Sequence, residues 1–148
     1  TSLTPFSSIL SQQVLLNTLG ETTINIPNPL IGGTYFVFVR HRNSLETWSA
    51  APVSISLINN SYDFTSTATS AYGNQLKATG DGKFSLFSGD VNQDGSIDLQ
   101  DLLLIESGTS VFISGYEATD LNGDGLTESI DGSIIENNSL SGIMLQRP

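Results

Sequence analysis

The sequence has no cysteine and no long apolar run, and each of these absences excludes a class of protein. Without cysteine there is no disulfide framework, no cysteine zinc site and no thiol redox motif. No apolar stretch approaches the ~18 residues that a membrane span needs. A serine elbow, a Walker phosphate loop and a dinucleotide glycine pattern are also missing. We therefore expect a protein that is not an enzyme and does not insert into a membrane.

Basic residues are scarce in the second half of the chain. Residues 1–84 hold four acidic and four basic side chains, whereas residues 85–148 hold eleven acidic side chains against Arg147 alone, so the net charge of −10 lies entirely in the second half. This charge step predicts two units, at residues 1–87 and 88–148. The acidic unit would repel nucleic acid and attract divalent cations. The chain begins at Thr1 without signal-peptide features, so we expect a fragment or a processed form of a longer protein.

Residues 1–87 are predicted to be all-β. Short runs of β-forming residues separated by turns about every 8–12 residues predict a β-sandwich, Ig-like or prealbumin-like in class. Alternation places Val53, Ile55 and Leu57 toward the core. Asp81-Gly82 predicts a hairpin turn before the last strand. The predicted strands are residues 8–16, 22–26, 34–42, 53–57, 62–65 and 84–87.

Two features of the first half raise the question of a ligand site. His41 is the single histidine and stands between Arg40 and Arg42, so we expect an exposed or capped polar side chain. Aromatic residues form either part of the core, which is the favoured interpretation, or a carbohydrate-stacking face. The aromatic residues in question are Trp48, Tyr35, Tyr62 and Tyr72.

Two twelve-residue segments share the ligand template of a calcium loop. Loop 1 spans residues 90–101 and loop 2 spans residues 120–131. Oxygen-bearing side chains stand at positions 1, 3, 5, 9 and 12, glycine at position 6 permits the sharp turn, and position 7 supplies a backbone carbonyl. We expect one calcium ion in each loop, two in all. The predicted ligands are Asp90, Asn92, Asp94, Ser96 (carbonyl), Asp98 and Asp101 in loop 1, and Asp120, Asn122, Asp124, Leu126 (carbonyl), Glu128 and Asp131 in loop 2.

The charge of these loops favours metal binding over a solvated acidic face. Each loop brings four carboxylates together, and at an effective dielectric constant of ~20 each close pair of carboxylates costs about 2–4 kcal/mol without a cation. A random acidic stretch would not repeat the whole template. Loop 2 has Thr127 at position 8, where loop 1 has Ile97, so we expect weaker binding in loop 2 or a looser contact between these two residues.

One helix is predicted after each loop. Strand and turn residues precede loop 1, so the repeated unit is a loop followed by a helix. The two helices are expected to pack antiparallel, with most of the ordering free energy supplied by metal. We expect the tail, residues 139–148, to pack on the helices or on the β half, and no flexible linker between the units. The residues predicted at helical spacing are Leu99, Leu102, Leu103, Leu104, Ile105 and Glu106, then Ile130, Ile134 and Ile135.

Residues 89–138 resemble a dockerin domain, and the motifs that carry the likeness are residues 89–98 and 119–125. The resemblance implies calcium-dependent folding with EF-hand-type loops, an extracellular setting in a bacterial protein, and docking to a cohesin domain through the helix faces. Positions 10 and 11 are Leu99-Gln100 in loop 1 and Ser129-Ile130 in loop 2, so the two helix faces differ. No Lys or Arg follows in either helix. The β half ahead of the loops is similar in arrangement to an X-module.

Three functions remain open at this stage. The first is a non-catalytic docking module at the C-terminus of a secreted bacterial protein, with a cohesin-like partner. The second is a purely structural calcium-stabilised module. The third is a carbohydrate-binding β-sandwich with a calcium-stabilised appendage. An exposed apolar helix face favours the first, a face covered by the tail or the sandwich favours the second, and exposed coplanar aromatics favour the third.

Overall fold

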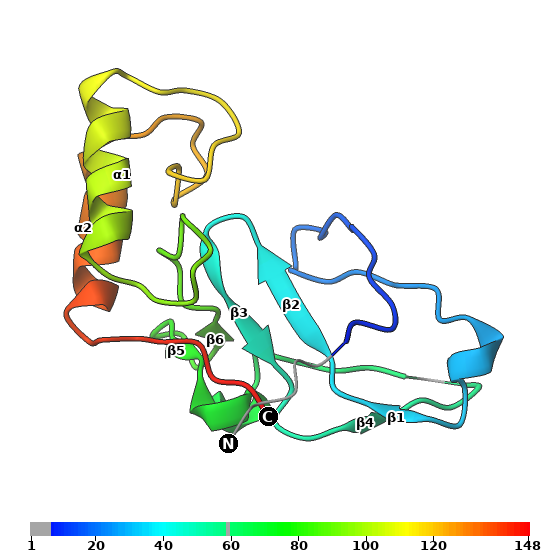
Figure 1. Cartoon of the computed structure of the whole chain (residues 1–148). Helices are drawn as coiled ribbons and strands as arrows, with labels where there is room; N and C mark the ends of the chain where they lie inside the picture. Colours follow the sequence, from blue (N-terminus) through cyan, green and yellow to red (C-terminus); the bar gives the residue numbers. More distant parts are fainter. Residues whose placement is uncertain (1–6, 59) are drawn as a thin grey trace.

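The computed structural model describes residues 7–58 and 60–148, which form a β-rich N-terminal part and a helical C-terminal part (Figure 1). The described strands form three antiparallel pairs. They are β1 (Thr34–Tyr35) with β4 (Val53–Ser54), β2 (Phe38–His41) with β3 (Ser44–Trp48), and β5 (Lys77–Ala78) with β6 (Phe84–Ser85). Short 3-10 helices lie at Asn28–Leu30, Ala68–Ser70 and Tyr72–Asn74, and the two α-helices are α1 (Leu99–Ser110) and α2 (Ser129–Ser139).

The predicted β character of the first half is confirmed, but the Ig-like or prealbumin-like sandwich is not. The described strands remain three separate pairs, and the predicted strand at 34–42 is divided into β1 and β2. The predicted strands at 8–16, 22–26 and 62–65 are irregular. Alternating sequences form strands only where a second layer covers their apolar side, and here Leu15 is 93% and Leu57 81% exposed. The hairpin turn at Asp81-Gly82 is confirmed, since it joins β5 to β6.

The hairpin of β2 and β3 is the best-packed part of the first half. All five residues of β3 are buried, including Glu46. The Trp48 indole N–H donates to Glu46 Oε1 over 2.7 Å, and the guanidinium groups of Arg40 and Arg147 form ion pairs with the same carboxylate. Burial alone would raise the pKa of Glu46, but these hydrogen bonds and positive charges outweigh burial and hold that pKa below its usual value.

Trp48 belongs to the core of this hairpin. It is 7% exposed and stacks on Phe38 with ring centroids 4.8 Å apart. A carbohydrate-stacking platform needs an aromatic face open to solvent, and Trp48 does not offer one. The core interpretation of this residue is therefore the correct one.

One apolar core joins the two parts of the chain. Leu45 of β3 is fully buried and clusters with Val91, Ile97, Ile105 and Ile135 from the loops and helices. Phe87, just before loop 1, packs against this cluster. The second half therefore has an apolar residue of the first half in its centre, and the division at residues 87 and 88 stays a prediction.

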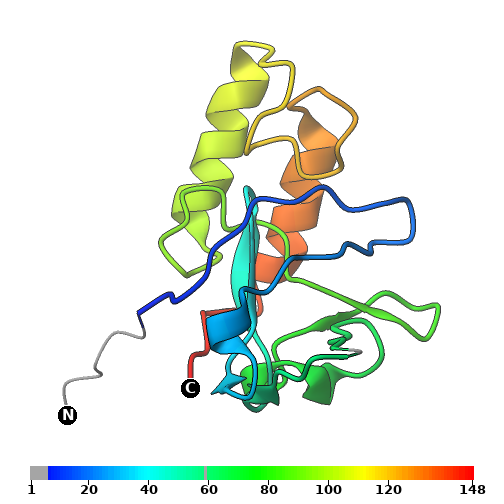
Figure 2. The ribbon, with the colours of Figure 1, turned by 90° about the vertical axis from the view of Figure 1, so that its right-hand side faces the viewer.

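The two helices run antiparallel and side by side (Figures 1 and 2). Each buries only a narrow stripe, which is centred on Ile105 in α1 and on Ile135 in α2. The apolar residues predicted at helical spacing are therefore buried only in part, because helix and loop contacts cover one stripe and leave Leu99, Leu103, Leu104 and Ile130 exposed. No helix in the described residues is long and apolar enough to cross a membrane.

Two short chain segments pair with loops 1 and 2. The tail lies along loop 1, where Ile97 N–H donates to the Ile143 carbonyl over 3.0 Å. The segment after α1 lies along loop 2 in the same way, since Thr127 N–H donates to the Ile113 carbonyl over 2.9 Å. The expected pairing of Ile97 with Thr127 is therefore wrong. Each position-8 residue uses its backbone to hold the segment that follows a helix.

The tail also reaches the β half, as predicted. Gln146 N–H donates to Gln75 Oε1 over 3.0 Å, and Arg147 Nε donates to Glu46 Oε1 over 3.0 Å. The last residues of the chain thus connect loop 1 to the buried carboxylate of β3.

Candidate metal centre

Asp90, the first predicted ligand of loop 1, is buried and incompletely hydrogen-bonded. Its side chain is enclosed by the loop, and Gly95 N–H donates to Oδ2 over 3.3 Å. The other oxygen, Oδ1, is buried and has no hydrogen-bond partner among the described residues. Burial first, and then the negative charges of Asp101 and Asp94, raise the pKa of Asp90 to about 6. A bound cation would remove both penalties, so this loop has the electrostatic signature of a cation site.

Glycine at position 6 and the αL residue at position 4 produce the tight turn in both loops. Gly95 has φ 89° and Gly125 has φ 88°, a conformation that glycine adopts without steric cost. Position 4 is also left-handed, with φ 59° at Gln93 and 82° at Gly123. These turns direct the side chains of positions 1, 3 and 5 toward the loop backbone, where Asn92 Oδ1 and Asp94 Oδ1 accept bonds from the N–H groups two residues ahead.

The position-12 aspartates tie each loop to its helix. Asp101 Oδ1 accepts from Val91 and Asn92 N–H over 2.9 and 3.2 Å, and its Oδ2 accepts from Asp98 N–H over 3.0 Å. Asp131 repeats this arrangement with distances of 2.8, 3.1 and 2.9 Å. Both side chains are completely buried. Positions 9 and 12 also form the capping box of each helix, which explains why α1 and α2 begin where they do.

Asp120, the first predicted ligand of loop 2, has a different environment from Asp90. Its Oδ1 accepts from Gly123 N–H over 2.8 Å and its Oδ2 from Gly125 N–H over 3.1 Å. Arg42 Nη2 lies 3.6 Å from Oδ2 and donates to the backbone carbonyl of Asp120 over 3.0 Å. The carboxylate of loop 2 thus already has a positively charged neighbour.

The predicted ligands are gathered loop by loop, but their carboxylates do not converge on a single point. Within residues 7–58 and 60–148, no group of three or more His, Cys, Asp or Glu side chains is arranged to hold a metal. Asp101 and Asp131 are engaged with backbone N–H groups, and positions 3 and 7 offer an amide and a carbonyl. A calcium ion would draw on this mixture of oxygens, which is the kind of ligand set that calcium accepts. The buried Asp90 Oδ1 is the observation that makes loop 1 fit such an ion.

The turn between β2 and β3 supplies residues that the sequence did not predict for the site. Asn43 Nδ2 donates to the Asp120 carbonyl over 2.8 Å, and Gly89 N–H donates to the Asn43 carbonyl over 2.7 Å. His41 is exposed and its Nδ1 lies 2.9 Å from Asn43 Oδ1, as expected for a capped polar residue. A sequence gives no sign of these contacts, because Asn43 and Asp120 are 77 residues apart.

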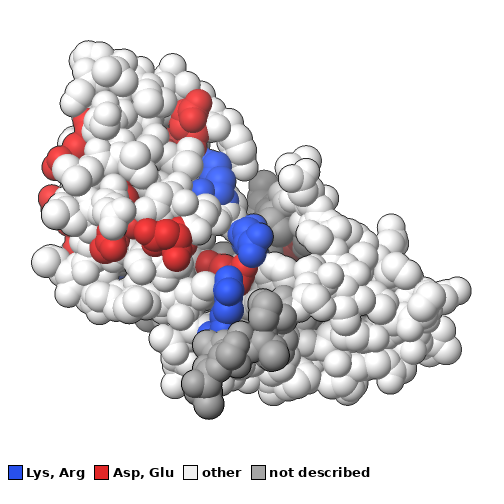
Figure 3. Space-filling view, in the orientation of Figure 1, with Lys and Arg blue, Asp and Glu red and all other residues white. Residues whose placement is uncertain are grey.

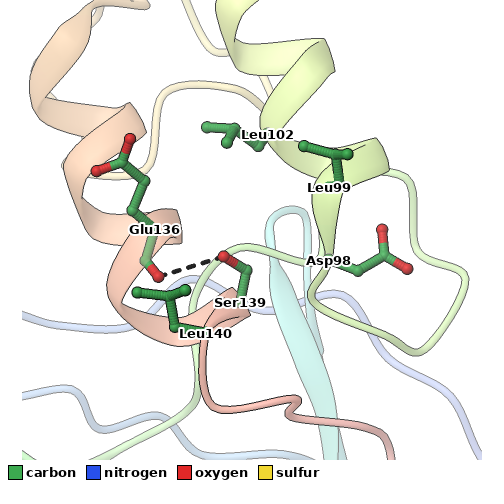
Figure 4. Close-up of a pocket in the computed structure, with 6 residues that line it drawn as sticks. All are labelled: Asp98, Leu99, Leu102, Glu136, Ser139 and Leu140. Atoms are coloured by element: carbon green, nitrogen blue, oxygen red, sulfur yellow. Dashed lines mark hydrogen bonds between the residues drawn. The ribbon is translucent and has the colours of Figure 1, made fainter.

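The surface charge separates the two parts. In Figure 3 most of the visible acidic side chains lie over the helical part, and the visible basic side chains lie along the junction with the β half, with some acidic atoms between them. An open groove of about 450 Å³ lies between the start of α1 and the end of α2 (Figure 4). Its walls are Asp98, Leu99, Leu102, Glu136, Ser139 and Leu140.

Comparison with known families gives one match that covers the loops and helices. Residues 88–140 match the family model of the Dockerin type I domain. Comparison with curated proteins and with solved structures gave no match. Dockerin domains bind calcium and cohesin domains and occur in extracellular or cell-surface proteins. The match spans both loop–helix units, so the C-terminal part of this chain is a dockerin domain.

Proposed function

We propose that this chain is a non-catalytic, calcium-stabilised docking module of a secreted bacterial protein and that it binds a cohesin-like domain. The observation that carries the proposal is an exposed apolar helix face within the dockerin match. Leu99, Leu103, Leu104 and Ile130 are 63%, 54%, 45% and 54% exposed. Several large apolar side chains exposed on one pair of helices are typical of a protein-binding site.

Two calcium ions, one in each loop, would stabilise the loops from which the two helices of this face begin. Calcium would supply positive charge to the four carboxylates of each loop. The residues that would hold it are those at positions 1, 3, 5, 7, 9 and 12, from Asp90 to Asp101 and from Asp120 to Asp131. Because positions 9 and 12 also cap the helices, an ordered loop fixes the start of the helix that follows it.

The groove in the docking face lies at one end of the helix pair, between the start of α1 and the end of α2. Leu99, Leu102 and Leu140 line the groove of Figure 4. Thirty residues after Leu99 and Leu102, the repeat has Ser129 and Gly132. A partner that inserts an apolar side chain at the start of α1 would find no equivalent place at the start of α2, so we expect a single binding orientation.

A purely structural role is the second candidate, and the tail favours it. Ile143 and Leu145 pack against the shared core, and Arg147 reaches Glu46. The tail thus stiffens the chain end without any partner. It does not cover Leu99 or Leu103, which is why we place docking first.

Binding to cohesin domains tests the proposal. We expect the calcium-loaded protein to bind at least one member of a panel of purified cohesin domains in calorimetric titration, and Leu99→Asp to weaken that binding at least about tenfold, since a carboxylate would be buried in an apolar contact. Leu57→Asp is the matched control, because Leu57 is 81% exposed in the β half. Loss of affinity in both variants, or in neither, would contradict docking through the helix face.

A further inference from the structure

The turn between β2 and β3 places one arginine beside loop 2. Arg42 Nε donates to the Glu117 carbonyl over 2.8 Å, and its Nη2 donates to the Asp120 carbonyl over 3.0 Å. The same nitrogen lies 3.6 Å from Asp120 Oδ2. The guanidinium is 4.0 Å from the ring centroid of Tyr116, and the Arg42 side chain is 19% exposed. Asp120, with a side chain 4% exposed, therefore interacts with a cation that is largely shielded from solvent.

Loop 1 receives neutral contacts from the same turn and from the first residue of β3. Gln93 Nε2 donates to the Ser44 carbonyl over 3.3 Å, and Gly89 N–H donates to the Asn43 carbonyl over 2.7 Å. In the described part of the chain, the ion pairs join Arg40 and Arg147 to Glu46 and Arg42 to Asp120, so no basic side chain pairs with a predicted ligand of loop 1. The two loops share a template and differ in this one charge.

We propose that Arg42 is a tethered cation for loop 2. When calcium is absent it partly neutralises Asp120 and keeps loop 2 folded. When calcium is present it repels the ion and lowers the affinity of loop 2. The inference rests on the proposed calcium function, because it concerns the first ligand position of that loop.

The physical argument is competition for one carboxylate. A divalent ion bound through Asp120 would share that carboxylate with the guanidinium, and two cations on one anion repel each other. Salt screens this repulsion weakly because both side chains are mostly buried. The backbone bonds of Arg42 to Glu117 and Asp120 hold the guanidinium in place, so it cannot move away without releasing the turn.

The test compares wild-type protein with Arg42→Gln. Calcium binding is followed at each loop separately through the amide NMR signals of the position-6 glycines, Gly95 and Gly125. We expect Arg42→Gln to tighten calcium binding in loop 2 by about three- to tenfold and to leave loop 1 within about twofold. In calcium-free protein, we expect the loop 2 amides of this variant to exchange with solvent at least about threefold faster.

Asn43→Ala separates charge from scaffolding. Asn43 donates to the same carbonyl of Asp120 over 2.8 Å but carries no charge. Its removal should weaken or leave unchanged the calcium affinity of loop 2, whereas removal of the Arg42 charge should strengthen it. Arg40→Gln is the control for loss of a positive charge at a distance, because Arg40 pairs with Glu46, and it should leave both loops unchanged.

The outcomes distinguish this inference from the proposed function. If the wild-type protein binds calcium in neither loop, the proposed function and the tethered cation are both overturned. Binding in both loops, with loop 2 weaker or unaltered in Arg42→Gln, would overturn the tethered cation alone. Tighter binding of loop 2 in that variant, with faster amide exchange when calcium is absent, supports it.

Discussion

Loops 1 and 2 have the same ligand template but are supported differently. Their position-12 aspartates make the same three backbone hydrogen bonds at nearly the same distances. Their position-1 aspartates differ, because Asp90 has a buried oxygen without a partner and Asp120 lies beside Arg42. A duplicated motif therefore keeps its internal bonds, while the surrounding structure sets the charge balance of each copy.

This difference indicates that a bound cation would stabilise loop 1 more than loop 2. Loop 1 carries an uncompensated buried carboxylate next to Asp101 and Asp94, an arrangement that costs free energy until a cation arrives. Loop 1 also contacts the tail. Its residues Val91 and Ile97 lie in the same apolar cluster as Leu45 of β3. Calcium in loop 1 would therefore stabilise more of the molecule than calcium in loop 2.

Removal of calcium gives the largest expected effect. We expect chelation to lower the melting temperature of the calcium-loaded protein by roughly 10 °C or more, because metal binding is coupled to folding of the loops. Hydrogen exchange should then speed up more at residues 90–101 than at residues 120–131, since Arg42 remains beside loop 2. Re-addition of calcium is the control and should restore protection. Equal loss of protection in both loops would contradict the proposed difference in charge balance between loop 1 and loop 2.

Alanine at position 12 tests the feature that the loops share. Asp101→Ala and Asp131→Ala each remove a buried carboxylate that accepts three backbone N–H bonds, and each should lower the free energy of unfolding by about 3 kcal/mol in saturating calcium. Urea denaturation measures this loss. Glu106→Ala, at an exposed acidic residue of α1, is the control and should change stability by less than about 0.5 kcal/mol. A marked difference between the two position-12 variants would show that the loops diverge there as well.

The sequence predicted the duplicated part of the molecule well, for a physical reason. Two helices after two loops and their antiparallel packing follow from local spacing. Residues within such a short repeat must contact one another, so a pattern read along the chain describes the contacts in space. The candidate ligands of each loop were predicted for the same reason, and their role in calcium binding remains a prediction.

The first half was predicted less well because its structure depends on distant contacts. Strand β3 reads as polar in sequence, yet Glu46 is buried because Arg40 and Arg147, the latter 101 residues away, offset its charge. Residues 22–26 alternate like a strand, but no second layer within the described residues covers them. Arg42 was recognised only as a neighbour of His41, since its contacts with Glu117 and Asp120 span more than seventy residues.

The pH dependence of calcium-free protein gives the smallest expected effect and sharpens the contrast between the position-1 aspartates. Burial and neighbouring negative charges raise the pKa of Asp90 to about 6 in the folded state, so the folded protein binds more protons than the unfolded chain between pH 4 and pH 6. The stabilisation from Asp90 is therefore fully present below its unfolded pKa and is lost as pH rises through about 6. Lowering the pH from 7 to 5 should stabilise the calcium-free protein by about 1 kcal/mol in urea denaturation. Asp90→Asn should remove most of this gain and Asp120→Asn should keep it, because an asparagine at position 90 has no proton to bind. Burial also raises the pKa of Asp101, so a smaller gain from that carboxyl should remain. A gain of unchanged size in Asp90→Asn would mean that Asp90 is not the group that titrates, and the buried oxygen of loop 1 would not be the origin of the difference between the loops.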